Sequence, residues 1–219
     1  CRRQSAPQGS MDLMDFIDFI SFSIFNSPFS IVRHRLVGKG VVQLECPKNR
    51  RGVAGPDMII LHYTAGRDAM SSANFLIRAD VKASAHLIIG RDGQVIQLVP
   101  FNIEAWHAGK SCYEGRSELN HYSIGIELDN LGQLRSEGGR FVAECGKEVP
   151  IRDVYMKDSD KEVTYWHRYT DVQERVLEEV CDLLTEYYPI RDIVGHSDVS
   201  SRKVEPGPAL QLCDWMKYY

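Results

Sequence analysis

The feature that most constrains the fold is an uninterrupted apolar run, Met58-Ile59-Ile60-Leu61, that ends in His62. Four apolar residues in succession predict a strand buried on both faces, because a half-solvated strand would alternate apolar and polar residues. Such a strand lies inside a sheet and carries the residue that follows it to the sheet edge. The sequence therefore predicts a strand-end imidazole in position to bind a metal ion.

A second strand and a loop supply matching groups further along the chain. Residues 192–194 predict a strand that leads into GHSD at residues 195–198, and RKVEPGP follows at residues 202–208. These motifs contribute His196 and the carboxylate of Glu205. Catalytic zinc commonly binds two imidazoles and one carboxylate or thiolate and keeps a fourth position for water. Together with the first histidine, the motifs predict such a site.

Two carboxylates near these motifs need separate roles. The run SIGIEL at residues 123–128 holds Glu127 among apolar neighbours, where burial raises a carboxyl pKa toward the range of a general base. Asp198 is closer in sequence to the second histidine than Glu205 is, so it is the alternative third ligand. We favour Glu205, because a short Asp side chain after a strand readily braces the loop by accepting nearby backbone N–H groups.

Five motifs occur in an order typical of one hydrolase family. They read LHYTAG, SAHLIIGRDGQVIQLVP, AWHAG, NHYSIGIEL and GHSD followed by RKVEPGPAL. Over roughly residues 47–215 the chain resembles the type-2 N-acetylmuramoyl-L-alanine amidases, a family that also includes peptidoglycan recognition proteins and an amidase-type phage lysozyme. The resemblance implies a Zn²⁺-dependent hydrolase that acts on peptidoglycan or muropeptides. Enzymes of this family cut the amide between the lactyl group of N-acetylmuramic acid and the first L-alanine of the stem peptide, so the resemblance implies this reaction here.

The resemblance also assigns the site residues. His62 and His196 match the two histidine ligands, Glu127 matches the general base, and Lys203 matches the lysine that stabilises the oxyanion. The third ligand is usually Asp or Cys in a stretch resembling GRKxDPGP, whereas Glu205 stands there and the loop is one residue shorter. The extra methylene of glutamate offsets the shorter loop. Outside this motif, Lys203 and its arginine neighbour would be read as a solvated basic pair.

The alternative function is a peptidoglycan-recognition module that keeps the fold and has lost catalysis. The joint presence of both histidines, the general base and the lysine argues against that loss. The one feature that favours a loss of catalysis is Glu205, which stands where the family usually has Asp or Cys.

The remaining histidines receive weaker assignments. His107, with Trp106 in AWHAG, is predicted to line a sugar or peptide groove, and a structural role is weighed equally. His86 alternates with apolar residues on a predicted strand, so we expect it in the core or behind the metal ligands and leave it outside the catalytic set. Three others are expected at the surface or in packing: His34, His121 and His167.

Composition fits one globular enzyme domain. The chain has 219 residues, of which 43% are hydrophobic and 26% charged, enough for a substantial core. A formal charge of −4 without a basic stripe argues against nucleic-acid binding. The six cysteines form no C-x-x-C pair and are predicted to be reduced thiols. No feature of the sequence indicates an oligomeric state.

The predicted fold is a single α/β domain with a central mixed sheet flanked by helices and a zinc site at one sheet edge. Besides the strands above, residues 84–89 and 94–99 predict strands joined by a hairpin turn at 91–93. Residues 71–79 predict a short helix. The clearest helix spans residues 171–188, with Thr170 as its N-cap and an apolar stripe on one face.

Residues 131–169 are rich in glycine and charges and show no strong periodicity. They predict an extended loop or small hairpin beside the site, where it could shape substrate choice. Its aromatic residues are expected to pack it against the body: Tyr165, Trp166 and Tyr169.

The amino-terminal part divides into two segments before a catalytic domain at residues 47–219. Residues 1–10 are predicted to be a tag or linker, because Gly9-Ser10-Met11 resembles an expression-vector junction; a lipoprotein beginning at Cys1 is the alternative. Residues 11–46 form a docked segment with an amphipathic helix over 12–29. Three aspartates there argue against a membrane span or secretory signal, which favours a cytoplasmic location over a periplasmic or secreted one.

Overall fold

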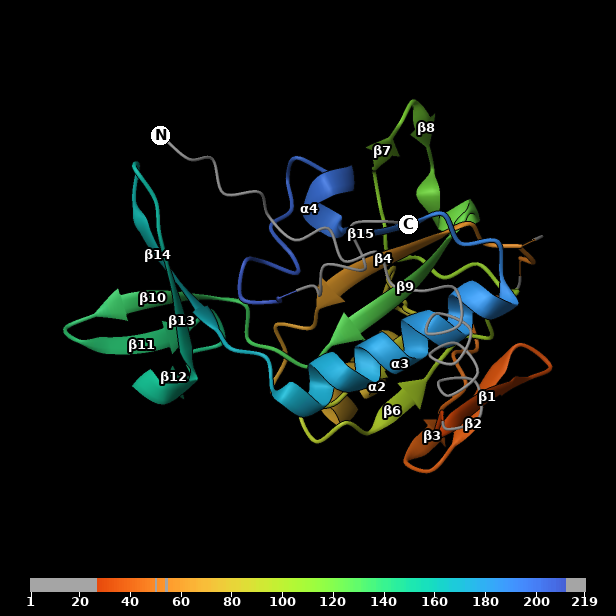
Figure 1. The fold of residues 1–219 in the computed structure, drawn as a ribbon, viewed down its shortest axis with the longest axis horizontal. Helices are drawn as coiled ribbons and strands as arrows, with labels where there is room; N and C mark the ends of the chain where they lie inside the picture. The colour runs from red at the N-terminus through yellow and green to blue at the C-terminus, as the bar shows by residue number, and fades with distance from the viewer. Residues whose placement is uncertain (1–26, 50, 54, 212–219) are drawn as a thin grey trace, which may run out of the picture.

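A computed structural model describes residues 27–49, 51–53 and 55–211 (Figure 1). The predicted tag at residues 1–10 lies outside the described residues. So does the helix predicted over residues 12–29, except its last residues, and Phe29 begins a strand.

A mixed six-stranded sheet forms the centre of the protein, in the order β15-β4-β9-β5-β6-β3. The four strands from β15 to β5 are parallel, β6 is antiparallel to β5, and β3 is parallel to β6. This architecture confirms the predicted α/β fold. The strands are β3 Val41–Gln43, β4 Met58–Tyr63, β5 Leu87–Ile89, β6 Val95–Gln97, β9 Ser123–Leu128 and β15 Asp192–Gly195.

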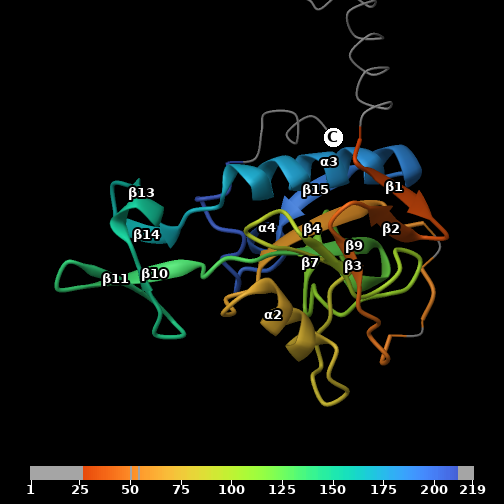
Figure 2. The same cartoon turned by 90° about the horizontal axis from the view of Figure 1, so that it is seen from below.

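Helices cover the two faces of this sheet (Figure 2). Helix α3 (Asp171–Tyr187) packs on the face that presents Ile59 and Leu61, and α2 (Ala69–Leu76) lies on the opposite face. All four residues of the apolar run before His62 are fully buried, which explains why the run is continuous. The predicted N-cap is confirmed, because the side chains of Thr170 and Gln173 form a reciprocal capping box.

Most predicted elements match the structure within a few residues. The strands predicted at 58–62, 123–128 and 192–194 are β4, β9 and β15. Those predicted at 84–89 and 94–99 are shorter, because only residues 87–89 and 95–97 pair in the β5–β6 hairpin. Small elements complete this part of the chain: β7 Cys112–Tyr113, β8 Arg116–Ser117, η1 Leu119–His121 and α4 His196–Val199.

An amino-terminal hairpin docks on α3. It consists of β1 (Phe29–Val32) and β2 (Arg35–Gly38), and its apolar side chains join the core around α3. The ring Nδ1 of His34 lies 2.7 Å from the Tyr188 hydroxyl just after the helix. The hairpin therefore extends the core and contributes no group to the sheet edge that carries the site.

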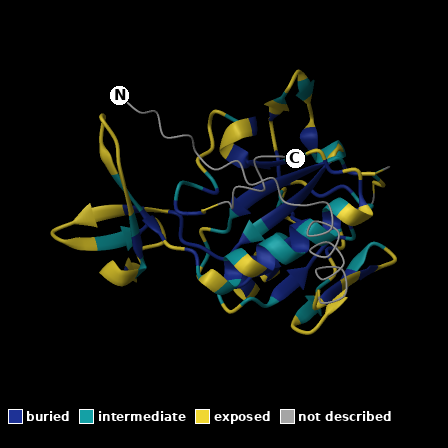
Figure 3. Ribbon diagram, in the orientation of Figure 1, coloured by how far each residue is buried: buried dark blue, intermediate teal, exposed yellow. Residues whose placement is uncertain are grey.

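Residues 131–169 differ most from the prediction of a loop or small hairpin. They contain a five-stranded antiparallel sheet, ordered β12-β11-β10-β14-β13, that projects from the body (Figures 1 and 3). Its elements are β10 Gln133–Glu137, β11 Arg140–Ala143, β12 Glu148–Val149, η2 Ile151–Asp153, β13 Val154–Asp158 and β14 Val163–His167.

The second sheet escaped prediction because much of its surface is exposed and its strands are rich in charge. Its own core is small and centred on Leu134, Val149 and Val154. Gly138 and Gly139, both at positive φ, form the turn between β10 and β11. Two such glycines favour the tight turn of a hairpin, so this local signal was available in the sequence.

The aromatic packing predicted for this region is confirmed for Trp166 and Tyr169, which are buried in the main core. No helix among the described residues is long and apolar enough to cross a membrane. The four cysteines in the described part of the chain are unpaired thiols: Cys46, Cys112, Cys145 and Cys181.

The packing of α3 generates a stability prediction. Leu184 is fully buried against the sheet, whereas its neighbour Leu183 is only partly buried. We expect Leu184→Ala to lower the free energy of unfolding by about 2–5 kcal/mol, since it leaves a cavity. Leu183→Ala is the matched control and should cost clearly less. Urea denaturation of both variants measures the difference, and equal losses would contradict this packing.

Candidate metal centre

Two parallel strands deliver the two histidines to one edge of the sheet. In the register of β4 and β15, Gly195 pairs with Leu61, so the next residue of each strand is a histidine. The rings of His62 and His196 lie with centroids 4.5 Å apart and planes at 76°. Both side chains are almost completely buried. The predicted pair is therefore brought together by strand pairing.

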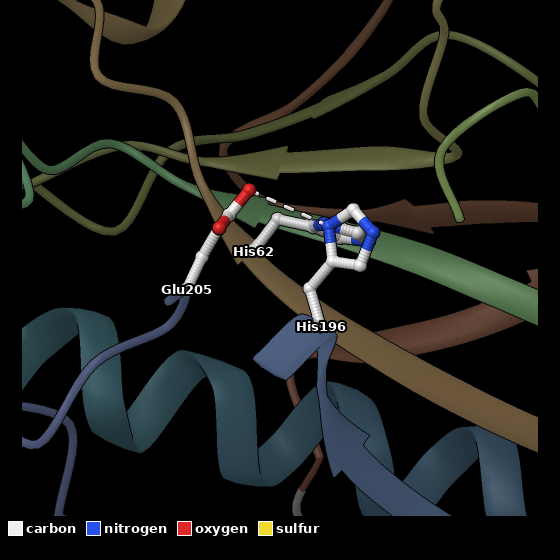
Figure 4. Close-up of side chains that lie close together, drawn as sticks. All are labelled: His62, His196 and Glu205. Atoms are coloured by element: carbon white, nitrogen blue, oxygen red, sulfur yellow. Dashed lines mark ion pairs between the residues drawn. The ribbon is translucent and has the colours of Figure 1, made fainter. Parts of the chain in front are cut away.

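The third potential ligand, Glu205, lies on the loop after α4 (Figure 4). The backbone carbonyl of Glu205 accepts a hydrogen bond from the Ser197 N–H at 2.9 Å, which returns the loop to the strand end. A potential ligand atom from each of His62, His196 and Glu205 lies within 4.8 Å of the others, the one such group of three found among the described residues. Asp198 is not in this group.

Glu205 is held as a carboxylate. Burial opposes its ionisation, but hydrogen bonds and its closeness to His196 outweigh burial and lower the pKa to about 2. Its Oε1 lies 3.1 Å from Nζ of Lys203, and its Oε2 accepts the Val204 N–H at 2.9 Å. The ionised carboxylate is the form that binds a cation.

The His196 ring has a free nitrogen directed at this carboxylate. Its Nε2 lies 3.2 Å from the Ala108 carbonyl oxygen, which can only accept, so Nε2 carries the proton. Its Nδ1 lies 3.4 Å from Oε1 of Glu205 and has no hydrogen-bond partner among the described residues. Burial, with the nearby His196 and Lys203, holds the pKa of His62 well below its usual value. A buried, unpaired ring nitrogen facing a carboxylate fits a metal ion.

Glu127 lies beside the first histidine. It pairs with His62 in the parallel register of β4 and β9, so both side chains project from the same face. Its Oε2 is shielded from solvent and has no partner in the described part of the chain. Burial, followed by repulsion from Glu205, raises its pKa to about 8, although Lys203 acts in the opposite direction. This carboxyl can exchange a proton near neutral pH.

The remaining candidates take other positions. Asp198 braces the strand end, since its Oδ2 accepts the Gly195 N–H at 2.7 Å. His86 is fully buried and bonded through both ring nitrogens to backbone groups, in keeping with a core role. His107 is buried, with its Nδ1 3.0 Å from Nε2 of His62, and its predicted contact with substrate stays a prediction. Trp106 is 37% exposed, and its predicted contact with substrate stays a prediction.

Two clefts flank the candidate metal centre and share Val204 as a common wall. One, of about 560 Å³, lies between the β13–β14 hairpin and the loop after α4, and Lys157, Trp166 and Lys203 line it. The other, of about 530 Å³, lies between β10 and the body and includes Arg135. The second sheet thus forms one side of both clefts.

Comparison with known proteins shows the family to which the chain belongs. A family described as N-acetylmuramoyl-L-alanine amidase matches residues 51–208, a span that contains both histidines, both carboxylates and the lysine. The chain belongs to this family. It is therefore an N-acetylmuramoyl-L-alanine amidase by family, and the resemblance predicted from the ordered motifs is confirmed.

Named relatives agree with this assignment. The amidase is 32% identical over 170 residues to the 1,6-anhydro-N-acetylmuramyl-L-alanine amidase AmpD of Escherichia coli (strain K12), covering 76% of this chain and 73% of the relative. A crystal structure of a selenomethionine AmpD derivative superposes with a TM-score of 0.52 at 27% identity, covering 82% of this chain and 93% of that one.

A second solved structure is AmpDh3 of Pseudomonas aeruginosa in complex with an anhydromuramic pentapeptide. It has a TM-score of 0.52 and 28% identity, covering 75% of this chain and 58% of the other. These likenesses confirm the mixed α/β fold with few helices.

The raised pKa of Glu127 predicts how the stability of the metal-free amidase depends on pH. The folded state keeps this proton up to about pH 8, while an ordinary unfolded carboxyl loses it near 4.5. Stability from this group is therefore present below pH 4.5 and lost as pH rises to about 8. In the presence of chelator, we expect wild type to lose stability relative to Glu127→Gln across this window.

Urea unfolding at pH values spanning this window provides the measurement. Glu137→Gln, on the exposed β10–β11 hairpin, is the control and should follow wild type throughout. Parallel curves for wild type and Glu127→Gln would show that Glu127 is not perturbed in the folded protein.

Proposed function

We propose that this amidase hydrolyses the lactyl–L-alanine amide of muropeptides with zinc held by His62, His196 and Glu205. The observation that carries the proposal is the convergence of two imidazoles and one ionised carboxylate within 4.8 Å. The set is typical of catalytic zinc, and the unpaired Nδ1 of His196 supports a cation between the three groups. Bound zinc supplies Lewis-acid chemistry, which polarises an amide carbonyl and makes water acidic enough to ionise near neutral pH.

Glu127 is the proposed general base. Its shielded Oε2 accepts a proton from the attacking water and returns that proton to the amide nitrogen as the C–N bond breaks. A pKa of about 8 suits both transfers, because the carboxyl neither holds nor releases the proton too strongly near neutral pH. The strand register keeps it adjacent to His62 throughout.

Lys203 is the proposed electrostatic partner of the transition state. Its ammonium lies 3.1 Å from Glu205 and its side chain is 46% exposed, so it borders both the ligand set and the larger cleft. A fixed positive charge there stabilises the negative charge that develops on the carbonyl oxygen during attack. Its ion pair with Glu205 holds the side chain at the site before substrate arrives.

The proposed substrate is a soluble muropeptide that ends in 1,6-anhydro-N-acetylmuramic acid. Support comes from the name of the Escherichia coli relative and from the anhydromuramic pentapeptide bound to AmpDh3. The two clefts beside the second sheet provide room for a sugar on one side of the scissile amide and a peptide on the other.

Cleavage of a defined anhydro-muropeptide tests this function. Mass spectrometry should detect free stem peptide after incubation with zinc-loaded enzyme, and chelation should abolish its release. Glu205→Ala should weaken zinc binding by more than the roughly 100-fold that loss of an outer partner costs. Asp198→Asn can still accept the Gly195 N–H, so it is the control and should retain zinc and turnover.

Three results would change the proposal. Normal zinc binding and turnover by Glu205→Ala would place the third ligand elsewhere. Faster release from intact peptidoglycan than from the anhydro-muropeptide would reject the soluble substrate. Binding of muropeptide without cleavage by the zinc-loaded wild type would leave a recognition module.

A separate prediction concerns Lys203. Lys203→Met removes the positive charge but keeps most of the side chain's volume, so we expect kcat to fall about 10²–10³-fold while one zinc ion is still bound. Its neighbour Arg202 is exposed and lines a different pocket, so Arg202→Met is the matched control and should change kcat little. Steady-state kinetics together with metal analysis distinguishes loss of charge from loss of zinc. An unchanged kcat in Lys203→Met would contradict this role.

A further inference from the structure

Behind the two candidate zinc ligands lies a buried histidine that the mechanism above does not use. We propose that His107 is a positioning residue that fixes which ring nitrogen of His62 is free to bind metal. The inference rests on the proposed zinc ligands and deepens that function. It gives His107 a role that differs from the substrate contact predicted from the sequence.

The protonation of His107 follows from its neighbours. The Ser123 hydroxyl lies 2.6 Å from the Leu119 carbonyl oxygen, which can only accept, so the hydroxyl donates its single proton there. Toward Nε2 of His107, at 3.2 Å, Ser123 can then only accept. Nε2 of His107 therefore carries the ring proton, and Nδ1 of the neutral ring is an acceptor.

The acceptor nitrogen of His107 determines the tautomer of His62. Nδ1 of His107 lies 3.0 Å from Nε2 of His62, so the proton of His62 must reside on Nε2. The other ring nitrogen, Nδ1, is left with an exposed lone pair for a metal. In the opposite tautomer, His62 would present a proton to the metal and two unprotonated nitrogens would face each other.

The residue after His107 orients the second proposed ligand, His196. The Ala108 carbonyl accepts the proton of His196 Nε2, as described above, so adjacent residues set the tautomers of both imidazoles. Oδ1 of Asn120 accepts the backbone N–H groups of His107 and Ala108 at 3.0 and 2.8 Å. One amide side chain thus anchors the backbone that orients both rings.

The sheet is shaped to admit this ring. A Cβ atom at Gly125 would lie 2.3–2.6 Å from three ring atoms of His107, so only glycine allows the imidazole to lie against β9. The Gly125 N–H in turn donates to Nδ1 of His86 at 2.9 Å, which fixes that stretch of backbone. With 9% exposure, His107 is a group packed for contact with His62 and not for contact with solvent.

The first test reads the tautomers without zinc. In metal-free protein labelled with ¹⁵N-histidine, long-range ¹H–¹⁵N correlation at a pH where the rings are neutral reports which nitrogen carries the proton. We expect His62 and His107 both to carry it on Nε2. In His107→Leu, which removes the acceptor that faces Nε2 of His62, we expect His62 to show a mixture of tautomers. A His62 ring protonated on Nδ1 in the wild type would overturn the proposal.

The second test measures zinc affinity by competition with a chelator. His107→Leu removes the acceptor and should weaken zinc binding roughly 10- to 100-fold. His107→Gln can accept from His62 and donate to Ser123, so it should restore most of the affinity. Lys110→Met, at an exposed position in the same segment, is the control and should bind zinc like wild type. Urea unfolding of the metal-free variants verifies that each is folded.

The outcomes separate this inference from the proposed function. Wild-type zinc affinity in His107→Leu would overturn the positioning role, and so would equal losses of zinc affinity in His107→Leu and His107→Gln. Either result would mean that His107 serves only in packing. Failure of wild type to bind one zinc ion, with the expected tautomers present, would reject the proposed ligand set while the tautomer assignment stands. Weak zinc binding by His107→Leu, together with near wild-type zinc binding by His107→Gln, would support the proposal.

Discussion

The parallel pairing of β15, β4 and β9 is the constraint on which the site depends. Parallel strands place their carboxyl ends at one edge, and the observed register puts His62 beside Glu127 and next to His196. A slip of one residue in β4 would turn its histidine toward α3 and the apolar face. An imidazole buried without a polar partner among the apolar residues around α3 would be costly, so the hydrophobic core on that face fixes the position of the polar groups.

The pKa values of two neighbouring carboxyl groups are shifted in opposite directions because their surroundings differ. Glu205 is surrounded by donors and stays ionised, while Glu127 is shielded and lacks a partner for Oε2 among the described residues. The negative charge of the first adds to the cost of ionising the second. A ligand and a proton acceptor are thereby distinguished by position alone, although their side chains are chemically identical.

The sequence was sufficient for the parts of the fold that rest on burial. The apolar run before His62 and the SIGIEL run predicted β4 and β9 correctly, because strands covered on both faces are continuously apolar. The second sheet could not be read in this way, since its charged, exposed strands depend on pairing with one another. At the site, the ordered motifs indicated both histidines, but the contact between His62 and His107 joins residues 45 apart and has no local signature.

The chain enters and leaves the second sheet at neighbouring points on the body. The Asn130 side chain donates to the His167 carbonyl at 2.9 Å, and the Leu131 N–H lies 3.1 Å from Nδ1 of that histidine, so the chain leaves and returns at hydrogen-bonded neighbours. Segments whose ends already meet can be replaced or shortened with little loss of closure entropy. Apart from Trp166 and Tyr155, which pack in the main core, the wall of both clefts can therefore diverge in evolution, or be exchanged by design, while the strands that hold the hydrolytic groups stay as they are.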